Sequence, residues 1–229
     1  MQTFQRNFFL YTAMGCGLFV VLTLVAMLVY PGGSHDDPAH AGYSFAHNFF
    51  SDLGLRQAHN GQPNPVAGTL FFIALLLTGV TLVLFFMQFR RFFLDTRRTQ
   101  VLSLFGALLG LGAGVCFAGV AFTPADVYME AHVAFVMWAF RLFPLAVLCF
   151  TLAMFETPAY PRGYAYVFLA FFGMLIAYYL LLTQGPGFET DQGLVIQALG
   201  QKVIVYASIL SIFIQSLGAW RLQRSQVGL

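Results

Sequence analysis

The chain has 229 residues, of which 59% belong to the apolar set and only 9% are Asp, Glu, Lys or Arg. About a quarter of the residues in a typical soluble domain are charged, so this composition excludes an ordinary water-soluble domain. The net charge of +2 gives no indication of a nucleic-acid partner. We therefore expect an all-α, polytopic membrane protein that forms one transmembrane helical domain over residues 1–229.

Six apolar stretches are long enough to span a bilayer, since a helix needs about 20 residues to cross hydrocarbon. They cover residues 8–30, 65–89, 100–122, 131–155, 164–183 and 194–219. The first stretch is longer than the core of a signal peptide and is not followed by a clear cleavage site. We expect it to be retained as the first span.

The charges outside these stretches are divided unequally between the two sides. Basic residues gather before the first span, in the second and fourth loops and after the last span: Arg6, Arg90, Arg91, Arg97, Arg98, Arg162, Arg221 and Arg224. The odd-numbered loops contain one basic residue, Arg56, and most of the acidic ones. Because cytoplasmic loops are rich in Lys and Arg, both termini are predicted to be cytoplasmic.

The first loop, 31–64, is too long to be a simple connector. Its beginning, PGGSHDDPAHAG, is rich in turn-forming residues, whereas YSFAHNFFSDLG reads as a short helix. Ser44 is a plausible N-cap and Gly54 a plausible stop. We expect this extracytoplasmic segment to form a helix along the membrane interface, with Asn48 and Asp52 one turn apart.

The third span contains Gly106, Gly110 and Gly114 in a continuous GxxxGxxxG pattern. Glycines at this spacing form a groove in which a neighbouring helix can approach closely. This pattern predicts a central packing helix.

Two charged residues lie where charge is costly. Arg141 and Lys202 are predicted to be roughly 12–15 Å below the outer surface, near the middle of the bilayer. No acidic residue lies inside a predicted span at that depth, so the partner could be a lipid phosphate or carboxylate, or Asp52 reaching in from the interfacial helix. Gln197 and Gln201 flank Lys202 and join the predicted lipid- or anion-binding set. Alternatively, Arg141 bonds carbonyls freed by Pro144, or Lys202 is solvated in a vestibule.

Polar residues at the outer rim form a second candidate set. His132 titrates near neutrality and, with Asp126 or Asp52, could supply acid–base catalysis. A helix cap and a satisfied interface histidine would explain these residues equally well. The remaining polar residues predicted at this rim are Asn48, Ser51 and Asn64.

The histidines give no metal-binding pattern. None forms the HxxxH or HExxH spacing that places two imidazoles on one helical face. An acidic, solvated loop explains His35, His40 and their neighbouring aspartates better than a zinc site does. We predict no metal site, and the sequence does not identify a cofactor.

Three stretches carry a resemblance to a known family: HNFFSDLG, NPVAGTLFFIALLLTGV and GLGAGVCFAGVAFTPADVYMEAHVAF. The chain resembles an uncharacterised six-helix membrane family of bacteria and archaea that is distantly similar to DRAM- and FRAG-type membrane proteins. The resemblance implies a multi-pass protein of the bacterial or archaeal cytoplasmic membrane. The residues that match the family's polar positions are Ser51, Asp52, Asn64, Pro124, Asp126 and His132.

These observations favour a protein that binds a membrane lipid, or another anionic amphiphile, in an outward-facing polar and cationic cavity. An intramembrane enzyme acting on a lipid-linked substrate is the alternative, so the sequence leaves catalysis open. A structural subunit with a membrane-protein partner is a third possibility.

Overall fold

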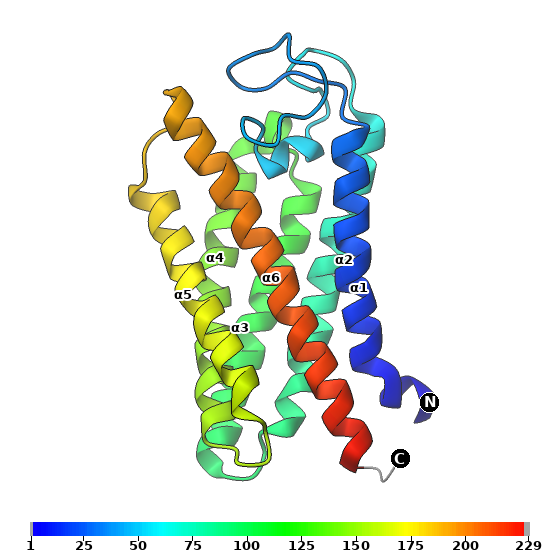
Figure 1. Ribbon diagram of the computed structural model, residues 1–229, viewed down its shortest axis with the longest axis vertical. Helices are drawn as coiled ribbons and strands as arrows, with labels where there is room; N and C mark the ends of the chain where they lie inside the picture. Colours follow the sequence, from blue (N-terminus) through cyan, green and yellow to red (C-terminus); the bar gives the residue numbers. More distant parts are fainter. Residues whose placement is uncertain (1, 227–229) are drawn as a thin grey trace.

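The computed structural model describes residues 2–226, with side chains from residue 7 to residue 225 (Figure 1). Its long helices are α1 (Gln2–Leu28), α2 (Pro65–Phe89), α3 (Arg97–Phe122), α4 (Ala125–Phe155), α5 (Arg162–Gln184) and α6 (Asp191–Gln226). Two short 3-10 helices are η1 (Phe50–Gly54) and η2 (Arg90–Phe92). All six long helices are long and apolar enough to cross a membrane, which confirms the predicted fold class.

The helices extend beyond the predicted spans at several ends. α4 begins at Ala125 rather than at 131, so it includes Asp126. Its backbone breaks at Tyr128, where φ is −131° and ψ is 50°. The first turn of α4 is therefore set apart from the remainder of the helix, and this turn carries Asp126.

The six helices form a ring in sequence order. Each packs against the next along the chain, and α6 packs against α1 to close the ring. Both termini lie at one end of the bundle and the first loop covers the other (Figure 1). We call the residues 29–64 loop 1 and the end that they cover the outer end.

Glycines bring α3 close to its neighbours, as the sequence pattern predicted. A Cβ atom on Gly114 would lie 2.8 Å from the carbonyl oxygen of Gly79 in α2. A Cβ on Gly106 would lie 2.8 Å from the ring of Phe150 in α4. Since real Cβ atoms do not approach this closely, these contacts require glycine and bind α2, α3 and α4 into a tight unit.

Loop 1 contains less helix than the sequence predicted. The segment from Ser44 forms a turn, and helical structure is limited to η1. A side chain competes here with helix formation: the Phe49 N–H, which a helix would pair with the Phe45 carbonyl, donates instead to Asp52 Oδ2 (2.9 Å). The η1 segment then enters the ring, where Phe50 and Leu53 are buried.

The glycine contact between α2 and α3 can be tested by adding one methyl group. Gly114→Ala should lower the unfolding midpoint in detergent, because overpacking a tight contact costs about 1–3 kcal/mol. Gly173→Ala is the matched control, since a Cβ there has no neighbour within 4 Å. Equal midpoints for the two variants would contradict the close approach.

Candidate functional site

A cleft at the outer end has a volume of about 1080 Å³. We call it the outer cleft. Its walls come from η1 and the residues after it, the first turns of α4, the α5–α6 connection and α6. The residues from the predicted sets that line it are Ser51, Asp52, Asp126, His132, Gln197 and Gln201. Helices far apart in the sequence thus bring most of the predicted outer-rim residues to one place.

Asp52 lies at the centre of a polar network that holds loop 1. Its Oδ2 atom accepts hydrogen bonds from the Asn48 amide (3.0 Å) and the Phe49 N–H (2.9 Å). The same oxygen lies 3.1 Å from His59 Nε2. This contact raises the pKa of His59, because the Asp52 carboxylate favours the protonated ring, and burial opposes it only in part.

Asn48 is completely buried and ties this network to the start of loop 1. Its amide also donates to the carbonyl oxygen of Gly33 (3.0 Å). The amide therefore connects two parts of the loop that are 15 positions apart. Asn48 is not among the residues that line the cleft, and its contacts are within loop 1 and with α6.

Asp126, in the first turn of α4, binds the part of loop 1 that follows η1. Its Oδ2 atom accepts hydrogen bonds from the backbone N–H groups of Arg56 (2.8 Å) and Gln57 (3.1 Å). The break at Tyr128 gives the first turn of α4 its own direction, which allows this contact. Asp126 thus anchors loop 1 to α4, and the sequence offered no sign of these partners.

His132 is buried at the border of the cleft, with 7% of its surface exposed. Its Nδ1 lies 2.7 Å from the carbonyl oxygen of Thr123. A carbonyl only accepts, so Nδ1 must carry the proton. In the neutral ring Nε2 then holds a lone pair, which makes His132 a hydrogen-bond acceptor and a possible base.

Lys202 is 1% exposed, and its ammonium group has partners within the protein. It donates to the carbonyl oxygens of Asn48 and Ala198, the latter at 3.1 Å. The nitrogen also lies 5.4 Å from the Tyr43 ring centre and 5.3 Å from that of Phe45. These carbonyl dipoles and ring faces provide the electron density that a buried cation requires. Next to it, Gln201 Oε1 accepts a hydrogen bond from the Phe50 N–H (2.6 Å).

Arg141 has a different environment from Lys202. Its side chain is exposed on α4, donates to the Tyr179 hydroxyl (3.3 Å) and lies 5.4 Å from the Trp138 ring centre. Neither cation lines the outer cleft. The structure does not bring the two together, and anion binding by either one stays a prediction.

A smaller pocket of about 370 Å³ lies beside the outer cleft. We call it the Asn64 pocket. It is enclosed by the end of η1, the first turns of α2 and the α3–α4 connection, and it shares Ser51, Leu55, Arg56 and His132 with the outer cleft. The two hollows therefore adjoin, with His132 on their common wall.

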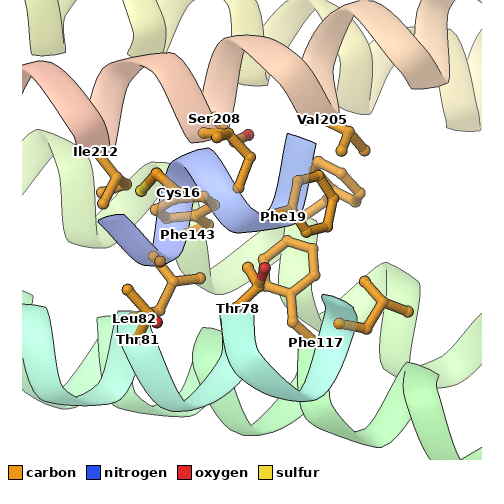
Figure 2. Close-up of a pocket in the computed structure, with 14 residues that line it drawn as sticks. Cys16, Phe19, Thr78, Thr81, Leu82, Phe117, Phe143, Val205, Ser208 and Ile212 are labelled. Atoms are coloured by element: carbon orange, nitrogen blue, oxygen red, sulfur yellow. The ribbon is translucent and has the colours of Figure 1, made fainter. Parts of the chain in front are cut away.

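A third cavity, of about 40 Å³, lies inside the helix ring (Figure 2). Rings and aliphatic chains make up most of its wall, among them Phe19, Phe117, Phe143 and Ile212. Cys16 and Ser208 also line it, but the Ser208 hydroxyl donates to the carbonyl of Ile204 (2.7 Å). The wall thus offers mainly apolar contact.

Loop 1 also meets the start of α6 through His47. Its Nε2 lies 3.1 Å from Asp191 Oδ1 and 3.9 Å from Asp36 Oδ2. The Ser34 hydroxyl donates to Asp36 (2.7 Å) and lowers the pKa of that carboxyl. These three side chains could hold a metal ion together, but two are exposed. The prediction that the chain has no metal site stays a prediction.

A family model described as "Protein of unknown function (DUF998)" matches residues 13–215. The chain belongs to this family. The predicted membership of an uncharacterised membrane family is thereby confirmed, while the distant similarity to DRAM- and FRAG-type proteins stays a prediction. No curated protein and no solved structure matches this chain.

The contact between His59 and Asp52 predicts a pH dependence of stability. Folding raises the pKa of His59 above its ordinary value of 6.5, so the folded state holds the proton more tightly. The contribution to stability is full below that value and is lost as the pH rises through the folded pKa. The unfolding midpoint should therefore fall as the pH rises above 6.5, and His59→Gln should reduce this fall.

His40→Gln is the control, because His40 is exposed on the same loop. It should keep the wild-type pH profile. An NMR titration that gave His59 a pKa below 6.5 would contradict the assignment.

Proposed function

We propose that this protein binds a membrane lipid, or another amphiphile, in the outer cleft. The observation that carries the proposal is a change of polarity along α4. In its first two turns the helix contributes Asp126 and His132 to the wall of the cleft, among the apolar residues Ala125, Val127 and Met129. Beyond His132 it contributes apolar residues alone: Val133, Val136 and Met137. At about 1.5 Å per residue, this apolar part is roughly 6 Å long and continues along α4 away from the outer end.

The other walls also combine the two kinds of residue. Loop 1 and α6 contribute polar residues, and Leu182 of α5 contributes an apolar side chain. A headgroup would meet hydrogen-bonding groups at the outer end, and an acyl chain would meet aliphatic side chains. This arrangement suits a molecule that is polar at one end and apolar at the other.

The charges in the cleft favour a headgroup that is not strongly anionic. The sequence argument for an anion rested on Arg141 and Lys202, which lie elsewhere. Among the residues described, the cleft brings together Arg56 with the carboxylates of Asp52 and Asp126. Recognition would then depend on hydrogen bonds, with Gln197 and Gln201 as contributors on α6.

A second candidate is an intramembrane enzyme acting on a lipid-linked substrate. His132 favours it, because the Thr123 carbonyl fixes the ring so that Nε2 can accept a proton. Ser51 and Asp52 line the same cleft. Native mass spectrometry can compare the lipids bound to the wild type with those bound to His132→Asn. A chemically modified lipid on the wild type that is absent from the variant would support a catalytic role for His132. The same lipids on both proteins would exclude it.

Blocking the cleft tests the lipid-binding proposal directly. Val133 lines the cleft and is 48% exposed, so Val133→Trp should fill the space without disturbing the core. Purified wild-type protein should carry lipid in native mass spectrometry, and Val133→Trp should lose most of it.

Leu108→Trp is the matched control, because Leu108 is 57% exposed on α3 and does not line the cleft. It should retain the wild-type lipid. Equal lipid content in all three proteins would overturn the proposal. A polypeptide that co-purified in place of lipid would point instead to a subunit of a membrane complex.

A further inference from the structure

Three side chains of types that commonly bind metal ions meet where loop 1 touches the start of α6. They are Asp36 and His47 of loop 1 and Asp191 in the first turn of α6, and one ligand atom from each lies within 4.8 Å of the others. His47 Nε2 is 3.1 Å from Asp191 Oδ1 and 3.9 Å from Asp36 Oδ2. We call these three residues the His47 cluster.

The spacing of the ligand atoms suits a divalent transition-metal ion. Zinc binds imidazole nitrogen and carboxylate oxygen at about 2.0–2.2 Å in a tetrahedral arrangement. Two ligand atoms of one zinc ion are then about 3.3–3.5 Å apart. The two separations from His47 Nε2 lie on either side of this range, so small side-chain rotations would bring all three atoms onto one ion.

The charge of the His47 cluster also favours a divalent cation. The carboxylates contribute two negative charges, and a protonated imidazole offsets only one of them. Among the described residues, no lysine or arginine forms an ion pair with Asp36 or Asp191. A divalent ion bound by two carboxylates and a neutral ring makes the cluster neutral, and it removes the repulsion between the carboxylates.

Hydroxyl groups behind the cluster hold two of its three ligands. The Ser34 hydroxyl donates to Asp36 Oδ1 (2.7 Å), which leaves Oδ2 as the oxygen nearer to His47. Ser44 Oγ lies 3.1 Å from His47 Nδ1. With the proton on Nδ1, the ring donates to Ser44 and presents the lone pair of Nε2 to the ion. Partners of this kind orient the ligands in most metal sites.

The His47 cluster is open to water, so an aqueous ion can reach it. The side chains of His47 and Asp36 are 33% and 38% exposed, and that of Asp191 is 79% exposed. A water molecule in the fourth position would complete a tetrahedral set of ligands. Imidazole selects zinc and similar ions over Mg²⁺ and Ca²⁺, because those two prefer oxygen ligands alone.

We propose that Asp36, His47 and Asp191 bind a divalent transition-metal ion of the zinc type, which fastens loop 1 to α6. The spacing of the histidines in the sequence predicted no metal site, because it could not show that His47 and Asp191, 144 positions apart, meet. His35 and Phe188 lie close in sequence to two of the ligands and line the outer cleft. The ion would thus hold one edge of the cleft, and the inference does not depend on lipid binding.

The test is a calorimetric titration of Zn²⁺ into the full-length, tag-free protein in detergent. The wild type should bind Zn²⁺ and should show no comparable binding of Mg²⁺ or Ca²⁺. His47→Gln and Asp191→Asn should each weaken zinc binding at least about tenfold, because each removes a ligand. His40→Gln and Asp37→Asn are the matched controls, since both residues are exposed on loop 1 outside the cluster, and they should keep the wild-type affinity.

Hydrogen–deuterium exchange shows whether the ion fastens the loop. Zn²⁺ should slow exchange at the backbone amides of residues 33–48 in the wild type and in Asp37→Asn, but not in Asp191→Asn. Equal unfolding midpoints of the zinc-free proteins would show that the variants are folded.

Three results would overturn the site: no zinc binding by the wild type, wild-type affinity in both ligand variants, or equal affinity for Zn²⁺ and Ca²⁺. The last result would reduce the cluster to an acidic surface that attracts cations without selection. Zinc binding without slower exchange in loop 1 would overturn the fastening of loop 1 to α6.

Discussion

The Lys202 ammonium group lies within the bundle with almost no access to solvent, and it donates to backbone carbonyls of Asn48 and Ala198. A charge at this depth costs at least about 2.5 kcal/mol, so the group must be matched by the protein around it. Loop 1 stabilises the ammonium group with one backbone carbonyl and two aromatic rings. Since Asn48 also binds Gly33 and Asp52, the buried cation on α6 contacts the residue that joins the early and late parts of loop 1.

The attachments of loop 1 to the helices shape the outer end of the bundle. With loop 1 fixed on α6, η1 reaches into the ring and Gln201 accepts the Phe50 N–H. Asp126 then holds the next residues of the loop from α4. These attachments lie at the outer cleft, and the Asn64 pocket adjoins it through shared lining residues. The hollows are thus bounded by a loop held at several points.

Hydropathy was sufficient to predict the helices, because each apolar stretch must span hydrocarbon and leave its backbone paired within itself. The GxxxGxxxG pattern likewise predicted the packing of α3, since backbone approach depends on the absence of side chains. Loop 1 was harder. Asn48 and Asp52 were correctly seen as neighbours, but they bind backbone donors and shorten the helix that the spacing suggested.

The partners of the site residues could not be read from the sequence. His47 and Asp191 are 144 positions apart, and Lys202 and Asn48 are 154 apart. No periodicity records such contacts. The residue types alone suggested a lipid anion or Asp52 as the partner of Lys202, because no acidic residue lay in a span at its depth. The sequence does not show which backbone carbonyls lie within reach of Lys202, because every residue carries one.

The bond between Lys202 and loop 1 also has a consequence for biosynthesis. Ribosomes make the chain from its N-terminus, so loop 1 leaves the translocation machinery long before α6 exists. Until the last helix enters the membrane, the Asn48 carbonyl lacks the Lys202 ammonium group, and loop 1 lacks its contacts with α6. The outer cleft is therefore complete only when translation is nearly finished. A nascent chain that stops before Lys202 would leave loop 1 more open to proteases on its side of the membrane than it is in the finished protein.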